Sequence, residues 1–557
     1  MLLQGSEIVV RTLMEQGVDL MYGYPGGMVL DIYDALWNHR DDIHHVLVAH
    51  EQGATHAADG YARATGKVGV CIATSGPGST NLVTGIATAF LDSVPMVVIT
   101  GNVPQASIGT DAFQEIDITG ITLPITKHNY FVSDPKMIAP AIREAFKLAM
   151  SGRRGPVLVD IAKNAQVEEA EWEQLAPVTC EPARAAADDE TLAAAIEAIN
   201  AANRPFVYFG GGAISCAAEE EICELADAID APIGCSLMGV SGVASNHPRF
   251  LGMEGMHGHL ASTMAMRECD CLIALGCRFN DRATGNRFKF KPGATIVHID
   301  IDVSELSKNT SDTFELQGDL KLTLQEMLPR INRKAHPMWS ENVAVLRAQE
   351  EQGLDKREGF TPRNIMRALD ARLTPDTPVV TDVGQHQMWA AQHLSFSRPR
   401  AFITSGGLGT MGFGMGAAIG AHMGTGKKAV LVIGDGGFGM CLNEMATAVA
   451  EGAQVVIMLM ENGTLGMVRQ MQTLFCDRHY SGTSLGARKT DFVALARAFG
   501  ADGMRASTLE ELEEAFDVAF AHDGVYLINC MVDQDELVLP MVPLGGSLDD
   551  VFDKVGE

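Results

Sequence analysis

An aspartate and an asparagine, each at the end of an apolar run, are the residues of this chain best suited to bind a hard cation. Asp435 stands in the triplet Gly434-Asp435-Gly436 after the apolar run 429–433, and Asn462 follows the run 455–460, 27 positions later. Glycine lets backbone N–H groups approach an anion, and Mg²⁺ prefers carboxylate, phosphate and water oxygens. The pattern therefore predicts a magnesium and diphosphate site. An ordinary βα turn with a buried Asn is the alternative.

Two buried strands must position these residues. A separation of 27 residues fits one strand–helix–strand unit, and the carboxyl ends of parallel strands meet at the edge of the sheet where ligands gather. We therefore expect Asp435 and Asn462 at the same edge of a parallel sheet.

The chain also contains an internal repeat at an offset of 358 to 360 residues. Gly66-Lys67, the turn 75–78, Ala87-Thr88-Ala89 and Asn102 recur as Gly426-Lys427, the turn 434–437, Ala446-Thr447-Ala448 and Asn462. Two related α/β domains are implied, and chance similarity between short βα units is the alternative. Since only the second copy has an Asp in its glycine turn, the two copies cannot both hold a cation in this way.

Length and composition limit the class of protein. The chain has 557 residues, 46 % of them hydrophobic, which suggests three or four domains with large cores. A formal net charge of −28 argues against nonspecific binding to nucleic acids or anionic membranes. The 11 Cys have neither metal-ligand nor disulfide spacing. The amino terminus lacks a signal or transit composition, so we expect a cytoplasmic protein, and we expect 406–424 to be a packed core segment instead of a membrane span.

Composition changes divide the chain into three doubly wound α/β domains. We expect an N-terminal domain at 1–166, a central domain at 190–332, a C-terminal domain at 362–540 and a tail at 541–557, with linkers around 167–189 and 332–362. The central domain is expected to contain strands at 206–209, 271–275 and 295–301. Its Gly210-Gly211-Gly212 turn does not satisfy G-x-G-x-x-G, so by itself it is weak evidence for a nucleotide.

The chain resembles the thiamine diphosphate enzymes, most closely the family of anabolic acetolactate synthase (acetohydroxyacid synthase) catalytic subunits, over nearly its whole length. The segments that carry the resemblance are Tyr22-Gly23-Tyr24-Pro25-Gly26-Gly27, His50-Glu51-Gln52-Gly53-Ala54, Gly109-Thr110-Asp111-Ala112-Phe113-Gln114-Glu115, Thr126-Lys127-His128, Gly276-Cys277-Arg278-Phe279-Asn280-Asp281-Arg282, Gly384-Gln385-His386-Gln387-Met388-Trp389, Gly409-Thr410-Met411-Gly412 and Leu465-Gly466-Met467-Val468-Arg469-Gln470.

The resemblance implies a fold, cofactors and partners. The family has an N-terminal pyrimidine-binding domain, a central domain that binds FAD and a C-terminal domain that binds diphosphate and Mg²⁺. Its reaction decarboxylates pyruvate and joins the product to a second 2-oxo acid, giving 2-acetolactate or 2-aceto-2-hydroxybutyrate in branched-chain amino acid biosynthesis. The family builds its site between subunits, so a homodimer or homotetramer is implied, and a separate regulatory small subunit is common.

For thiamine diphosphate, the resemblance assigns Glu51 to the proton on the aminopyrimidine ring and Met411 to the wedge that bends the cofactor. A helix-surface acid and a plain core Met are the respective alternatives. The metal ligands would be Asp435, Asn462 and the backbone carbonyl of Thr464. The other residues implied at this cofactor are Gly26, Gln385, His386, Gly409, Gly434, Gly436 and Gly437.

For the substrates, Arg282 is the candidate for the carboxylate of the second 2-oxo acid, because a guanidinium binds a carboxylate with two hydrogen bonds. An ordinary surface cation is the alternative. Phe113 would form an apolar wall, and Gln114 and Lys127 resemble catalytic residues near the site, although a solvated face is an open reading for Lys127. FAD, structural in role, is implied by resemblance at the following residues: Gly211, Gly212, His257, Arg278, Asp300 and Asp319.

Three positions depart from the family pattern. Met415-Gly416 replaces a usual Leu-Pro, Asn280-Asp281-Arg282 replaces Asp-Asp-Arg, and Met471 stands where Trp is frequent. The last change bears on the choice between pyruvate and 2-oxobutyrate, with plain core packing as its alternative. Other readings of the whole chain are a pyruvate oxidase, a simple 2-oxo acid decarboxylase, a flavin-free catabolic acetolactate synthase, or a noncatalytic homologue that binds ligand.

Overall fold

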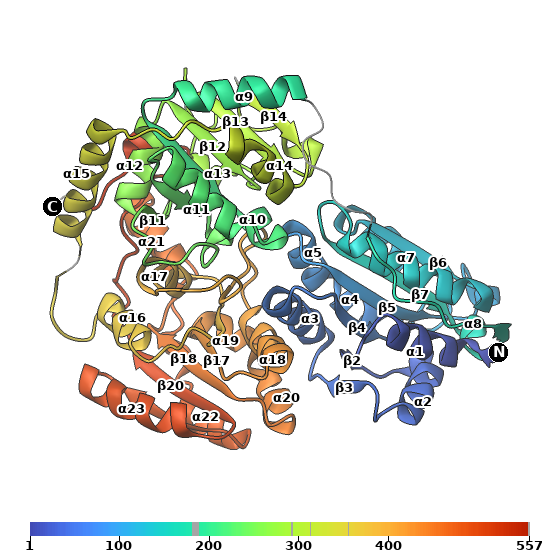
Figure 1. The fold of residues 1–557 in the computed structure, drawn as a ribbon. Coiled ribbons are helices and arrows are strands. Elements are labelled where there is room, and N and C mark those ends of the chain that lie inside the picture. The colour runs from blue at the N-terminus through green and yellow to red at the C-terminus, as the bar shows by residue number, and fades with distance from the viewer. Residues whose placement is uncertain (181–188, 291–292, 312, 355, 555–557) are drawn as a thin grey trace. The chain divides into compact units, whose positions relative to one another are not determined.

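Three six-stranded sheets form the framework of the protein in a computed structural model that describes residues 1–180, 189–290, 293–311, 313–354 and 356–554 (Figure 1). The strand pairs described within these sheets are parallel. The prediction of three parallel α/β sheets is therefore confirmed. Parts of the two predicted linkers (181–188 and 355) and of the tail (555–557) lie outside the described residues.

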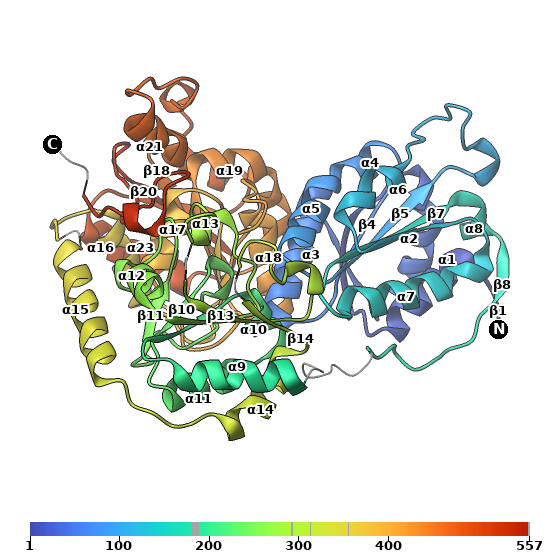
Figure 2. The ribbon, with the colours of Figure 1, turned by 90° about the horizontal axis from the view of Figure 1, so that it is seen from above.

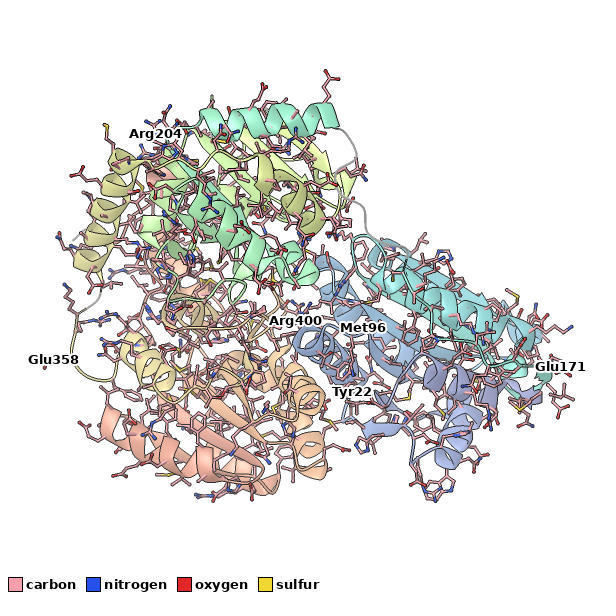
Figure 3. All side chains as sticks on the ribbon, in the orientation of Figure 1. Tyr22, Met96, Glu171, Arg204, Glu358 and Arg400 are labelled. Atoms are coloured by element: carbon pink, nitrogen blue, oxygen red, sulfur yellow. The ribbon has the colours of Figure 1, made fainter. Side chains whose placement is uncertain are left out.

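The N-terminal sheet has the strand order β3-β2-β4-β5-β7-β6. Its strands are β2 (Leu20–Tyr24), β3 (His44–Leu47), β4 (Gly69–Ala73), β5 (Met96–Asn102), β6 (His128–Val132) and β7 (Pro156–Ala162), and β1 (Leu2–Gln4) pairs antiparallel with β8 (Glu169–Glu171) beside it. Tyr22 and Met96, labelled in Figure 3, are fully buried in this domain.

Helices cover both faces of this sheet because its central strands are buried along their whole length and point successive side chains to opposite faces. Val70 and Ile72 of β4 pack with one set of helices, whereas Cys71 and Ala73 pack with the other. The helices are α1 (Gly5–Glu15), α2 (Leu30–Asn38), α3 (Glu51–Thr65), α4 (Pro77–Asn81), α5 (Val83–Leu91), α6 (Ile118–Thr122), α7 (Ile138–Met150) and α8 (Lys163–Val167).

The C-terminal sheet has the order β16-β15-β17-β18-β20-β19, which is the N-terminal topology repeated strand for strand. The interpretation of the sequence repeat as two related domains is confirmed. The strands are β15 (Val379–Thr381), β16 (Phe402–Ile403), β17 (Ala429–Gly434), β18 (Val455–Glu461), β19 (Asp502–Ala506) and β20 (Val525–Met531). The helices are α18 (Gly414–Thr425), α19 (Asp435–Cys441), α20 (Met445–Ala450), α21 (Gly466–Phe475), α22 (Phe492–Ala498) and α23 (Leu509–Ala521).

Corresponding helices of the two repeats, α3 and α18, pack directly against each other (Figure 2). Both helices end at a glycine in the left-handed conformation, Gly66 (φ +77°) and Gly426 (φ +65°), a common helix stop. Their contact brings the N-terminal and C-terminal sheets into one compact unit, which comprises Met1–Glu181, Thr377–Gly384 and Ile403–Met531.

The second compact unit comprises Pro182–Asp376, Gln385–Phe402 and Val532–Glu557, and it contains the central sheet. The strand order is β11-β10-β9-β12-β13-β14. The strands are β9 (Pro205–Phe209), β10 (Ile233–Cys235), β11 (Phe250–Met253), β12 (Cys271–Leu275), β13 (Thr295–Asp300) and β14 (Thr313–Gln317). The helices are α9 (Asp189–Ala201), α10 (Gly211–Cys216), α11 (Glu219–Ala228), α12 (Leu260–Glu268), α13 (Asp281–Thr284), α14 (Leu320–Met327), α15 (Pro337–Gly353), α16 (Pro362–Asp370) and α17 (Gln385–His393).

Helix α15 occupies much of the segment 332–362, so the prediction of a simple linker is wrong there. Trp339, Val343 and Leu346 lie on one face of the helix and are buried in the core of the central domain. Nothing in the described part of the chain is a helix with the length and apolar character needed to cross a membrane.

Candidate functional site

Asp435 lies where the sequence predicted, at the first position of α19 directly after β17. Its side chain is buried, and its carboxylate accepts hydrogen bonds from the N–H groups of Gly436 (3.0 Å) and Gly463 (2.9 Å). Burial raises the pKa of Asp435 to about 6, and the two N–H groups oppose this shift. Its described hydrogen bonds come from backbone groups and not from a cationic side chain, so a bound cation would supply the opposite charge that this buried carboxylate lacks.

Asn462 and Thr464 lie beside Asp435 because β17 and β18 pair in register, with Gly434 opposite Met460. The side-chain oxygen of Asn462 accepts the N–H of Thr464 (3.0 Å), and the buried Thr464 hydroxyl donates to the carbonyl of Thr483 (2.9 Å). The segment 462–464 is thereby held next to the carboxylate.

The donor set at this site suits Mg²⁺. Among the residues that the structure describes, no group of three or more His, Cys, Asp and Glu side chains is placed to hold a metal. A cation at Asp435 would instead take carboxylate, amide and carbonyl oxygens from the protein and complete its shell with phosphate and water, as Mg²⁺ commonly does.

The glycine turn after β17 is closely packed on both sides. A Cβ on Gly436 would lie 2.8 Å from Cδ2 of Leu465, and a Cβ on Gly437 would overlap Oδ1 of Asp382. A side chain at either position would therefore have to displace a neighbouring side chain, Leu465 or Asp382.

Met411 is brought to this turn by a loop with two left-handed glycines, Gly409 (φ +68°) and Gly412 (φ +91°). Its Cε lies 3.4 Å from the position that a Cβ of Gly436 would take. The structure thus places the predicted wedge residue against the predicted diphosphate turn, although the two are 25 residues apart in the sequence.

Glu51 is the first residue of α3 and is 9 % exposed. The side-chain amide of Asn81 donates to its carboxylate (2.9 Å), and a Cβ on Gly78 would lie 3.3 Å from the other carboxylate oxygen. In the same domain, Gly26 packs against Thr74. These residues follow β2, β3 and β4 and therefore gather at the carboxyl edge of the N-terminal sheet.

Gln114 also lies at this edge, in the left-handed conformation (φ +62°), next to Gly76. The counterpart of Asn462 in this repeat is Asn102, whose amide donates to Asp160 (2.6 Å) while its oxygen accepts the N–H of Val103 (2.8 Å). Asn102 is therefore engaged by side-chain and backbone partners within its own domain.

Lys127 is placed differently from Glu51. Its ammonium group donates to the carbonyls of Leu148 and Ser151 (2.5 Å to Ser151), at the carboxyl end of α7. These contacts stabilise the helix end, where a cation is favourable.

Phe113 is 82 % exposed, and Met471 is half-buried in α21. The proposed roles of Lys127, Phe113 and Met471 stay predictions.

Arg282, Gln385 and His386 belong to the second compact unit and are described within it. The guanidinium of Arg282 donates to Sδ of Met256 (3.3 Å), and its side chain is 57 % exposed. Gln385 and His386 are buried at the start of α17, where the amide of Gln385 donates to the carbonyl of Glu536 (2.7 Å).

The central sheet has the strand order of a dinucleotide-binding domain. Numbered along the chain, its order is 3-2-1-4-5-6, in which the direction of winding reverses between β9 and β12. Gly211 and Gly212 begin α10 directly after β9, and a Cβ on Gly212 would lie 2.8 Å from Cα of Gly276, which follows β12. This cradle at the reversal point fits a dinucleotide.

The remaining dinucleotide candidates follow the same pattern. Arg278 follows β12, Asp300 ends β13, and Asp319 follows β14 as the N-cap of α14. Asp300 is buried and accepts the N–H of Asp302 (2.9 Å). His257 is buried with no hydrogen-bond partner at Nδ1 in the described structure, and burial lowers its pKa to about 4.

Sequence reasoning missed Asn81 and Asp382. Asn81 stands three residues after Gly78 and looks like an ordinary helix residue. Asp382 follows the short apolar strand β15, a strand-end acid like Asp435, which is the signal that could have identified it.

Comparison with known protein families finds three matches. Residues 3–121 match the N-terminal thiamine pyrophosphate (TPP) binding domain of thiamine pyrophosphate enzymes, residues 192–327 match the central domain, and residues 382–530 match the C-terminal TPP binding domain.

Individual relatives are similar over nearly the full chain. The acetolactate synthase large subunit of Parasynechococcus marenigrum is 44 % identical, over 98 % of this chain and 90 % of its own length. The acetolactate synthase isozyme 2 large subunit of Escherichia coli is 43 % identical over 99 % of this chain and 100 % of its own length. The acetolactate synthase large subunit of Corynebacterium glutamicum is 43 % identical over 98 % of this chain and 90 % of its own length.

Proposed function

The chain belongs to the thiamine pyrophosphate enzymes and, among them, to the acetolactate synthase large subunits, and on this premise we propose that it makes 2-acetolactate in branched-chain amino acid biosynthesis. Pyruvate would lose CO₂, and the remaining two-carbon unit would be joined to a second pyruvate or to 2-oxobutyrate. The observation that carries the proposal is Met411 packed against the glycine turn that contains the buried Asp435.

Bound thiamine diphosphate supplies the carbanion chemistry that decarboxylation and carboligation require. Asp435, Asn462 and the carbonyl of Thr464 would hold Mg²⁺, and the backbone of Gly434, Gly436 and Gly437 would receive the diphosphate. Met411 would press on the cofactor from the adjacent loop, and Gly409 permits the turn that brings this loop into position.

Glu51 would hold the proton that the aminopyrimidine ring needs in order to act as a base. The side-chain amide of Asn81 donates to one of its carboxylate oxygens and holds the side chain in place. We propose a homodimer or homotetramer in which Glu51 of one subunit serves the cofactor held by another. The name of the relatives, large subunit, supports a separate regulatory small subunit as a further partner.

Arg282 would bind the carboxylate of the second 2-oxo acid. Its side chain is largely exposed, and its described neighbours are the thioether of Met256 and the carboxylate of Asp281 at 4.0 Å. The guanidinium can therefore donate stronger hydrogen bonds to a substrate carboxylate. Phe113 and Met471 are the further candidates for contact with substrate, and Gln114 is a candidate for a catalytic role.

FAD is proposed as a structural group in the central domain. The strand order and the close contact of Gly212 with Gly276 support a dinucleotide there. Carboligation involves no net oxidation or reduction, so no turnover of the flavin is required. We also place the protein in the cytoplasm.

Product analysis tests this function. The purified protein is incubated with pyruvate, thiamine diphosphate and Mg²⁺, with and without FAD, while flavin absorbance is followed. We expect acetolactate as the product and no reduction of flavin coupled to turnover. Acetaldehyde would indicate a simple decarboxylase, flavin reduction in each turnover an oxidase, and full activity without flavin a catabolic type of synthase. No product with saturating cofactors would indicate a noncatalytic homologue.

A further inference from the structure

Asp382 is a fully buried carboxylate to which the proposed function assigns no role. It follows β15, and its described hydrogen bonds come from backbone N–H groups: Val383 (2.8 Å), Gly414 (2.9 Å) and Gly412, which reaches both oxygens (3.1 and 2.9 Å). Burial raises the pKa of Asp382 to about 6, and the N–H groups of Gly414, Val383 and Gly412 favour its charged form.

The bonds of Asp382 hold the loop that carries Met411. Gly412 directly follows Met411 and is in the left-handed conformation, and both oxygens of Asp382 accept its N–H. On the other side of Met411, the N–H of Thr410 donates to the hydroxyl of Ser405 (3.1 Å). The backbone on both sides of Met411 is therefore fixed by buried side chains.

The same carboxylate touches the glycine turn. A Cβ on Gly437 would overlap Oδ1 of Asp382, so the carboxylate packs against the turn that begins with Asp435. Asp382 thus contacts two elements at once, the loop of Met411 and the turn of the metal ligand.

We propose that Asp382 is a positioning residue that sets the distance between Met411 and the glycine turn, and thereby fixes the bend imposed on thiamine diphosphate. This inference rests on the proposed function, because Met411 acts as a wedge only if the cofactor binds there. An amide at position 382 keeps the size of the side chain but gives it one oxygen instead of two, so an NH₂ group would face one of the backbone N–H donors.

The test is Asp382→Asn, measured in the assembled protein loaded with thiamine diphosphate and Mg²⁺. Hydrogen–deuterium exchange at C2 of the bound cofactor, followed by NMR, reports how well the cofactor is bent without requiring substrate turnover. We expect exchange to slow at least about tenfold while the Kd for thiamine diphosphate changes by less than about threefold, because a small misplacement of a reacting group is costly in rate.

Asp160→Asn is the matched control. Asp160 is buried in the N-terminal repeat, its pKa is also raised to about 6 by burial, and its carboxylate accepts from Thr100 and Asn102 instead of from the Met411 loop. The Asp160→Asn variant should leave exchange at C2 of the cofactor unchanged, although it lowers the free energy of unfolding. Equal losses of exchange in both variants would overturn the proposal and indicate a general effect on folding.

If Asp382→Asn does not fold, Gly437→Ala tests the same proposal, because its added Cβ would displace the Asp382 carboxylate from the side of the glycine turn. Wild-type exchange in a fully loaded variant would overturn the proposal. An unmodified protein that binds no thiamine diphosphate would instead overturn the proposed function, so the two failures are distinguishable.

Discussion

Glu254 gives this protein a pH-dependent stability that can be calculated from its surroundings. It follows β11 and is 4 % exposed, and among the described residues its carboxylate has the Tyr208 phenol as a polar neighbour but no hydrogen bond of regular geometry. Its neighbours include Tyr208, Cys235 and Cys277, each of which is buried in the central domain. Burial raises the pKa of Glu254 from 4.5 to about 8, and the Tyr208 phenol opposes this only in part.

The direction of the effect follows from this raised pKa. The unfolded chain loses the proton near pH 4.5, whereas the folded protein keeps it until about pH 8. The stabilisation from this group is therefore complete below pH 4.5 and is lost as the pH rises through 8. The loss is about 1.4 kcal/mol per pH unit in this window and about 5 kcal/mol in all.

Replacing the carboxyl tests this reasoning. Glu254→Leu removes the ionisable group and fills the apolar site, so the Tm of the variant should exceed that of the unmodified protein by an amount that grows with pH. Between about pH 6 and pH 8 the difference should grow by about 2 kcal/mol, or roughly 4–8 °C in Tm. Thermal unfolding at several pH values measures it.

Two further variants sharpen the experiment. Glu254→Gln stays neutral and should show the same loss of pH dependence, although its buried amide still lacks partners. Glu315→Gln, on the exposed face of β14 in the same domain, should behave like the unmodified protein. If the Tm of Glu254→Leu and that of the unmodified protein run parallel across this pH range, Glu254 does not titrate as its burial requires.

Three further predictions concern the proposed site. Glu51→Gln keeps an oxygen for Asn81 and should retain the cofactor, while steady-state turnover falls by about 10² to 10⁴, since an amide cannot supply the proton; near-normal turnover would remove Glu51 from the mechanism. Asp435→Ala should weaken the Mg²⁺-dependent binding of thiamine diphosphate in a titration, and an unchanged Kd would discard the metal assignment. The unmodified protein, with Met471, should form acetolactate and acetohydroxybutyrate within about tenfold of each other from equimolar pyruvate and 2-oxobutyrate, because one methylene in an apolar pocket is worth about 1–3 kcal/mol. Met471→Trp should move that ratio towards acetohydroxybutyrate, whereas an unchanged product ratio would indicate that Met471 only packs in the core.

Local sequence was sufficient to predict the placement of Asp435 and Asn462. Each follows an apolar run, and runs of this kind form parallel strands whose carboxyl ends meet at one edge. The repeat likewise predicted two related domains, because the same spacing of strands, turns and helices produces the same topology. Helix α15 could also have been predicted, since Trp339, Val343 and Leu346 recur at helical spacing within a charged segment.

Other features depend on contacts between residues that are distant in the sequence. Asp382 meets Gly412 and Gly437, which are 30 and 55 positions away, and this combination of contacts is set by the packing of the loop and the turn. Lys127 resembles a catalytic residue of the family in the sequence, and only the folded chain shows that its ammonium group donates to carbonyls at the end of α7.

The sequence by itself determined which buried strands end in polar residues such as Asp435 and Asn462, because apolar periodicity and strand ends are local properties of the sequence. The tertiary structure alone decided the environment of each group. Glu254 stands before Gly255 in the sequence like a solvated loop residue, and only the packing of Tyr208, Cys235 and Cys277 around it makes it a buried acid with a raised pKa. Burial depends on what the rest of the chain places around a side chain, and neighbouring residues in the sequence do not encode it.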